Sequence, residues 1–184
     1  HSQWHLEHRM STLELKELSH PAGEVIKIAA GKTLDLKTQG SVTMPTGSVL
    51  QVVSVEDPDQ TTMTNTGYVD VGGLTASITP SSASSKILVR ITPITYISYN
   101  ADSYPITYAN IVRGSTVLKE KIAYYYAARA PNGYIEMGTN FNMEILDSPN
   151  TTSTVTYKVQ SATSSTVNSI WRVGSTITLM EIQG

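Results

Sequence analysis

The stretch KILVRITPITYISY, residues 86–99, alternates apolar and polar side chains with a period of two. That period places the apolar side chains on one face of a β-strand, and isoleucine, valine and threonine are residues that strands favour. Pro93 lies in the middle and has no N–H to donate to a neighbouring strand. The stretch therefore predicts one strand bent at Pro93, or two successive strands, with one buried face.

Comparable alternation recurs along residues 48–184, and no stretch shows sustained helical periodicity with caps. Gly72-Gly73 predicts a tight turn between two strands, Gly114-Ser115 a hairpin turn, and Gly138 a bulge within a strand. Strands without helices between them favour an all-β, antiparallel β-sandwich of the jelly-roll type over a parallel α/β fold. The expected strands are 48–55, 68–71, 74–79, 86–99, 106–113, 116–127, 134–146, 153–160, 168–173 and 175–182.

The chain is expected to have three parts. Residues 1–9, HSQWHLEHR, precede Met10 and are expected to be a remnant of an expression vector, which would leave His20 as the only native histidine. Residues 10–46 contain short alternating units separated by turn residues, which suit either a β-stem that needs partner chains or a meander beside the main domain. Residues 47–184 are expected to form the β-sandwich head.

The composition excludes several kinds of site. The 184 residues include no cysteine, so disulfides, thiolate zinc sites and cysteine nucleophiles are excluded. Thirteen basic and 15 acidic residues give a net charge of −2, which argues against nucleic-acid binding through a basic surface. No apolar run approaches the roughly 20 residues that span a bilayer, so no membrane partner is expected.

No catalytic motif stands out, so we expect no enzyme activity, cofactor or metal site. The acidic loop at residues 56–59, Glu-Asp-Pro-Asp, fits either a calcium site of oxygen ligands or a solvated loop, and the sequence favours the solvated loop because Pro58 stiffens it. Glu136, Glu144 and Asp147 could supply a carboxylate pair for glycoside cleavage, but nothing distinguishes them from the other acids.

Tyrosine is the anomalous residue type, with 10 Tyr against 1 Phe and 2 Trp. A tyrosine ring is apolar with a polar tip, which suits half-buried positions and contact surfaces. Many of these tyrosines flank two turn regions near residues 100–103 and 130–133, which predicts a binding surface there; the alternative is that Tyr replaces Phe in the core. The candidate binding residues are Tyr99, Asn100, Asp102, Tyr104, Tyr125, Asn132 and Tyr134.

Six segments occur in an order and spacing that are more specific than any one of them alone. They are GSVLQVV (47–53), YVDVGGL (68–74), SITPSSASSKILV (77–89), VRGST (112–116), LDSPNTTSTVTYKVQ (146–160) and STITLMEI (175–182). Together they resemble the distal region of tail-fibre-like proteins of tailed phages, those of marine and cyanobacterial phages in particular. The resemblance implies a homotrimeric virion protein with a host-receptor-binding tip and no catalytic residues. Residues 96–140 depart from the pattern, and receptor contacts are expected there.

These observations lead to one main hypothesis and three alternatives. The main hypothesis is a phage fibre protein, assembled in the host cytoplasm, whose stem at residues 10–46 attaches to other virion proteins. Its head would be a trimeric jelly roll, similar in strand order to the tumour-necrosis-factor and C1q type, that binds a bacterial surface glycan. The alternatives are a capsid decoration or tail-assembly protein, a free lectin-like carbohydrate-binding module and, with the least support, a glycan-degrading enzyme.

Overall fold

A computed structural model describes residues 30–32, 44–99, 106–124, 135–139, 141–164 and 167–184. The chain divides into two compact units, residues 1–43 and 44–184. In the first unit the description covers only a turn at 30–32, where Gly31 has a φ of 74°. The expected stem at residues 10–46 and the segment 1–9 therefore lie almost wholly outside the described residues, and the fold below is that of the second unit.

The second unit is built from β-strands that pair antiparallel, and the described residues contain no helix. This confirms the expected all-β, antiparallel architecture. The strands are β1 (Val49–Glu56), β2 (Thr61–Met63), β3 (Val69–Ile78), β4 (Lys86–Thr92), β5 (Thr95–Tyr99), β6 (Ile106–Arg113), β7 (Thr116–Tyr124), β8 (Ile135–Thr139), β9 (Met143–Asp147), β10 (Val155–Thr163), β11 (Val167–Trp171) and β12 (Thr176–Ile182).

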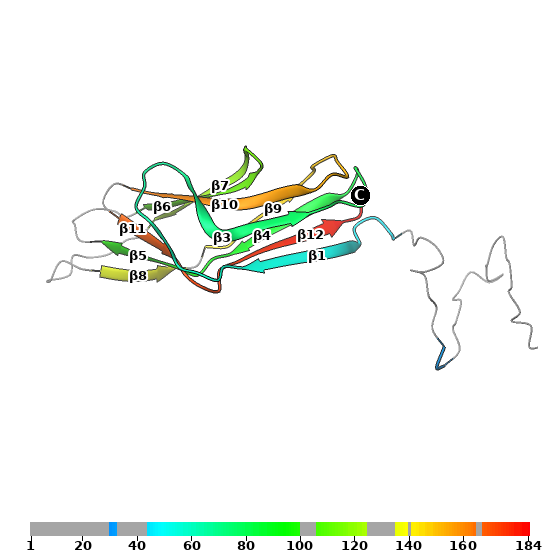
Figure 1. Cartoon of the computed structure of the whole chain (residues 1–184), viewed down its shortest axis with the longest axis horizontal. Helices are drawn as coiled ribbons and strands as arrows, with labels where there is room; N and C mark the ends of the chain where they lie inside the picture. The colour runs from blue at the N-terminus through cyan, green and yellow to red at the C-terminus, as the bar shows by residue number, and fades with distance from the viewer. Residues whose placement is uncertain (1–29, 33–43, 100–105, 125–134, 140, 165–166) are drawn as a thin grey trace, which may run out of the picture. The chain divides into compact units, whose positions relative to one another are not determined.

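The strands form two layers. One layer is the sheet β3-β10-β6-β7, and the other consists of two sheets, β1-β12-β4-β9 and β2-β11-β5-β8. The second of these sheets repeats the strand order of the first, because each of its strands adjoins its counterpart along the chain: β2 follows β1, β11 precedes β12, β5 follows β4, and β8 precedes β9. Figure 1 shows β5, β8 and β11 beyond the ends of β4, β9 and β12. We can count β1 with β2, β4 with β5, β8 with β9, and β11 with β12 as single long strands and renumber the strands 1 to 8 along the chain. Their order is then 1-8-3-6 in one layer and 2-7-4-5 in the other. That order of eight strands in two sheets is a jelly roll.

The long layer is the one made of the sheets β1-β12-β4-β9 and β2-β11-β5-β8. Its strands are interrupted where the two sheets meet, at Asp57, Pro93 and Ser175, and we call these interruptions the line of breaks. Pro93, between β4 and β5, cannot donate to the ladder, which confirms the predicted interruption. Ser175, fully buried between β11 and β12, replaces the lost ladder bonds: its hydroxyl accepts from Ile94 N–H at 2.9 Å, and its carbonyl accepts from Asp57 N–H at 2.8 Å. These bonds satisfy backbone groups that would otherwise be buried without partners.

The core lies between the layers and follows from the alternation along each strand. Ile87, Val89 and Ile91 of β4 are fully buried, whereas Lys86, Arg90 and Thr92 are exposed. The buried aromatic pair Phe141 and Trp171 packs edge to face, with 5.7 Å between ring centroids. Each such buried side chain contributes about 1.5–3 kcal/mol of hydrophobic stabilisation.

Two glycine predictions were wrong. Gly72-Gly73 is not a turn, because β3 runs through both residues, and the pairing register shifts opposite them between Lys158 and Gln160. Gly73 adopts a positive φ of 78°, and a Cβ there would clash with the Asp57 carboxylate. Gly138 is not in a bulge, because it pairs regularly with Tyr96; the expected strand 134–146 is instead divided after Thr139 into β8 and β9.

One further feature of the strand pattern differs from the expectation, and one agrees with it. The short strand β2 was not predicted, since three residues carry too little alternation. The hairpin turn at Gly114-Ser115 between β6 and β7 is confirmed.

Side chains join the layers at their edges. Lys119 and Lys121 of β7 donate to the carbonyls of Glu144 and Asn142, each at 2.9 Å, beside β9. At the opposite edge, the Gln51 amide donates to Thr79 carbonyl at 2.7 Å. Lysines on an edge strand also disfavour pairing with another chain along that edge.

Candidate ligand-binding pocket

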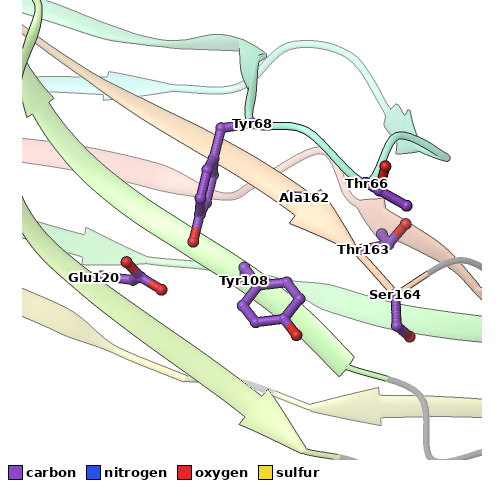
Figure 2. A pocket seen from close by; sticks show the side chains of 7 residues that line it. All are labelled: Thr66, Tyr68, Tyr108, Glu120, Ala162, Thr163 and Ser164. Atoms are coloured by element: carbon purple, nitrogen blue, oxygen red, sulfur yellow. The ribbon is translucent and has the colours of Figure 1, made fainter.

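An open pocket of about 380 Å³ lies on the outer face of the β3-β10-β6-β7 layer. It is formed near the start of β6 and the end of β10, together with the segment that leads into β3. Its side chains combine two aromatic rings, one carboxylate and several hydroxyls on a small apolar floor. The lining residues are Thr66, Tyr68, Tyr108, Glu120, Ala162, Thr163 and Ser164 (Figure 2).

Alternation and register place the floor of the pocket. In β6, Thr107 and Ala109 are buried toward the other layer, so Tyr108 between them faces outward. Tyr108 is directly opposite Ala162 of β10. Because the alanine side chain ends at Cβ, it leaves a hollow in the outer face of the sheet beside Tyr108. Ala162 itself is only 1% exposed, since larger side chains surround it.

The two tyrosines make the wall. The rings of Tyr68 and Tyr108 are edge to face, with centroids 6.4 Å apart and planes at 74°. Tyr68 comes from the residue just before β3, whereas Tyr108 comes from β6, so the contact joins segments that β10 separates. An edge-to-face pair stabilises the position of both rings by about 0.5–1.5 kcal/mol beyond their buried area.

Glu120 of β7 supplies the charge. The pKa of Tyr68 is raised to about 12, chiefly by burial and then by the neighbouring Glu120 carboxylate. Tyr68 is therefore neutral at physiological pH. Glu120 is in no ion pair with another described residue, since the ion pairs between described residues join Arg113 to Asp147 and Lys158 to Asp70.

Hydroxyl groups line the other side of the pocket. Figure 2 shows Thr66, Thr163 and Ser164 across Tyr108 from Glu120. The Ser164 hydroxyl oxygen accepts from Ile106 N–H at 3.1 Å, and the Thr163 hydroxyl donates to Asn65 carbonyl at 3.4 Å. The pocket thus presents hydrogen-bonding groups on two sides of an aromatic ring, which can orient a small polar ligand without reacting with it.

A polar row runs beside the pocket on the same face. Gln160 pairs with Asp70 on one side and with Asn110 on the other, and Asn110 pairs with Glu120. The Asp70 carboxylate accepts from Lys158 and Gln160, each at 2.8 Å, and these bonds lower its pKa. Asn110 is 3% exposed, and its side-chain oxygen has no hydrogen-bond partner.

None of the binding residues predicted from sequence is among the described residues that line this pocket. Tyr99 ends β5, but its side chain lies outside the described residues, as do Asn100, Asp102, Tyr104, Tyr125, Asn132 and Tyr134. The strand ends on either side of them are close in register, since Tyr99 pairs with Ile135 and Ile106 pairs with Tyr124. Tyr68 and Glu120 were not predicted from the sequence. The pairing of β10 with β3 and β6 brings Tyr68 to Tyr108, and the pairing of β6 with β7 places Glu120 on the same face.

The side chains of the acidic loop at residues 56–59 point into different surroundings, since Asp57 is buried and Glu56 and Asp59 are exposed. The described part of the chain holds no cluster of three or more His, Cys, Asp or Glu side chains that could bind a metal ion. Asp57 is fully buried at the line of breaks, where one oxygen accepts from Asp59 N–H at 3.2 Å and the other has no partner. Burial raises its pKa, against the effect of the Asp59 N–H bond.

The acids considered for glycoside cleavage are also placed apart. Asp147, at the end of β9, is buried and accepts from Arg113 at 2.6 Å and from the Tyr157 hydroxyl at 2.7 Å. Glu144 is exposed on β9, and Glu136 belongs to β8, where its side chain lies outside the described residues. The contacts of Asp147 give it a structural role in joining β6, β9 and β10.

A second surface feature is an apolar row across the outer face of β1-β12-β4-β9. Val52 pairs with Met180, Met180 with Leu88, and Leu88 with Leu146, so the four side chains form one line across four strands. Val52 is 56% exposed and Leu146 is 51% exposed. The neighbouring row, Ser54, Thr178, Arg90 and Glu144, is polar. A line of apolar side chains bordered by polar ones is typical of a protein contact surface.

No family model and no curated protein matches the chain. Among solved structures, the chain is similar to dimeric latent PorU from Porphyromonas gingivalis at 6% identity and a TM-score of 0.42, over 76% of this chain and 13% of that one. It is also similar to infectious bursal disease virus of the Gt strain at 15% identity and a TM-score of 0.37, over 80% of this chain and 36% of that one. The VP2 subviral particle of that virus gives 13% identity and 0.35, over 82% and 44%. The chain thus spans less than half of each, and these likenesses carry no argument about function.

Proposed function

We propose that the chain is a non-catalytic virion protein of a tailed phage, and that its jelly-roll head binds a glycan on the host surface through the pocket at Tyr68, Tyr108 and Glu120. The pocket is the observation that carries the proposal, because aromatic rings with carboxylate and hydroxyl groups around them suit the faces and rim of a sugar. The six segments that resemble phage tail-fibre proteins support the virion assignment.

Other parts of the proposal depend on the chain's organisation. We propose a homotrimer in which the apolar row from Val52 to Leu146 is buried between heads, and attachment to other virion proteins through residues 10–46. Three heads would then bind together, so that modest affinity at each pocket would add up through avidity.

The described residues include no helix long and apolar enough to cross a membrane.

The test is binding of labelled protein to cells of susceptible bacterial strains. Replacing Tyr108 with alanine removes the ring at the centre of the pocket, so binding should fall about tenfold, or by ~1.4 kcal/mol per site. Tyr96→Ala is the matched control: Tyr96 lies on β5 in the other layer, where its ring carries the Arg172 guanidinium 5.4 Å above it. Equal loss in both variants, or wild-type protein that binds no susceptible strain, would overturn the proposal.

A second candidate function is a capsid decoration or tail-assembly protein without host binding. The apolar row favours it, because that surface fits a protein partner as well as a second copy of the chain. Labelled protein that docks on purified virions and sticks to no host strain would support this candidate over the receptor-binding head.

A further inference from the structure

We infer that the pocket at Tyr68, Tyr108 and Glu120 takes an uncharged sugar ring and rejects anionic saccharides such as sialylated, sulfated or uronic-acid glycans. The inference rests on the proposed function, because it names the class of glycan for the same site. It follows from three properties of the lining residues that the structure describes: they include an acceptor carboxylate, they include no cation, and they form an aromatic wall.

The carboxylate is positioned to accept from a ligand. Glu120 is close enough to the Tyr68 hydroxyl to raise the pKa of that group. An ionised carboxylate has about four lone-pair sites and only accepts hydrogen bonds, so Glu120 can accept from a ligand. Glu120 is exposed on β7, and Figure 2 shows its carboxylate across Tyr108 from Thr163 and Ser164. Sugar hydroxyls are the donors that such a group would hold.

None of the described residues that line the pocket is a cation that could compensate that charge. Lys158, on the same face, is bound to Asp70 at 2.8 Å. Lys119 and Lys121 belong to the same strand as Glu120 but donate to carbonyls beside β9. A second negative charge about 4 Å from Glu120 would lower affinity about fivefold even at the dielectric constant of bulk water, and more in a partly enclosed site.

The remaining lining suits the two faces and the rim of a pyranose. The Tyr108 ring offers apolar contact to the C–H groups of one sugar face. Across the ring, the Ser164 hydroxyl oxygen already accepts from Ile106 N–H, so its own O–H remains as a donor to a ring or hydroxyl oxygen. A volume of about 380 Å³ is within the range of small-ligand pockets.

The test compares matched pairs of immobilised oligosaccharides, each neutral glycan beside its sialylated or sulfated counterpart, with the full chain at low salt. Wild-type protein should bind at least one neutral glycan, and its anionic counterpart at least about fivefold more weakly. Glu120→Gln keeps the acceptor oxygen and removes the charge, so the difference within each pair should shrink to about twofold or less. Glu144→Gln changes the net charge equally but lies on exposed β9, and it should leave the difference as in the wild type.

The outcomes separate this inference from the proposed function. Preference for the anionic member of the pairs, or a preference that Glu120→Gln and Glu144→Gln change equally, overturns the charge selection and leaves receptor binding intact. Neutral-glycan binding that survives Tyr108→Ala overturns the assignment of this pocket. Binding to host cells with none to any glycan overturns the sugar class alone, whereas absence of binding to both overturns the proposed function with it.

Discussion

Glu181, in β12, is a fully buried carboxylate held by neutral donors. Ser81 donates from both its backbone N–H and its hydroxyl at 2.7 Å, and the Gln51 amide donates at 2.6 Å. Burial alone would raise the pKa of Glu181, but the hydrogen bonds led by those from Ser81 outweigh burial and lower it. The ionised form is therefore bound more strongly in the folded chain than in the unfolded chain, and it stabilises the fold.

Replacing Glu181 with glutamine should lower the free energy of unfolding at pH 7 by about 2 kcal/mol, because the amide cannot accept from all these donors. Since the folded pKa lies below the ordinary value of 4.5, the wild-type advantage is full above that value and is lost as pH falls through the folded pKa. Urea unfolding at pH 7 and at acid pH measures both. Glu144→Gln, on the surface, is the control; equal costs for the two variants would contradict the role of Glu181.

Asp57 has the opposite linkage. Its folded pKa is raised above the ordinary value of 3.8, chiefly by burial, so its ionisation opposes folding as pH rises through and above that value. The residue nevertheless connects the line of breaks, because its N–H donates to Ser175 carbonyl and its carbonyl accepts from Gly174 N–H at 3.2 Å. These two backbone hydrogen bonds hold Asp57 at its buried position, although burial of its side chain disfavours the ionised carboxylate.

Strand β3 depends on the absence of a side chain at Gly73. A residue with Cβ at that position would be strained by the positive φ of 78° and would also clash with the Asp57 carboxylate and the Pro58 ring. Gly73→Ala should therefore lower the free energy of unfolding by about 3 kcal/mol or more. Thermal or urea unfolding of the purified variant measures the loss.

Gly114, in the turn between β6 and β7, provides the matched control. It has a positive φ of 58° as well, but a Cβ there would meet no atom within 4 Å. Gly114→Ala should cost only about 1 kcal/mol, from backbone strain alone. The difference between the two variants isolates the contact between β3 and Asp57, and equal costs would mean that this contact relaxes without penalty.

The assembly depends on the outer face of β1-β12-β4-β9. If heads pack through the apolar row, Leu146→Asp should shift the 20.0 kDa chain from trimer to monomer, because an aspartate would be buried without a partner. Val173→Asp is the control, since Val173 is 53% exposed but lies after β11, outside the row. Light scattering at micromolar concentration reads the mass; a wild-type monomer, or a trimer unaffected by Leu146→Asp, would contradict this arrangement.

Much of the fold follows from local sequence, and the pocket does not. Alternation in residues 86–99 and 175–182 predicts β4, β5 and β12. Pro93 predicts the interruption between β4 and β5, because its missing N–H breaks the hydrogen-bond ladder in any sheet. Gly72-Gly73 has the sequence of a turn, but β3 runs through both residues, and the close approach of Asp57 to Gly73 exists only in the folded chain. The pocket requires Ala162 beside Tyr108 and Glu120 near Tyr68, and such pairings depend on register between distant strands.

The breaks at Pro93 and Ser175 also separate the strand registers of the two halves of the long layer. Deleting one residue within β5 would move Thr95–Tyr99 side chains to opposite faces, yet Lys86–Thr92 would keep its pairing with β12. A change of register in one half therefore leaves the strand pairing of the other half intact. What still couples the two halves is their shared core, because Met63 of β2 and Trp171 of β11 are buried in the same cluster as Ile91 of β4.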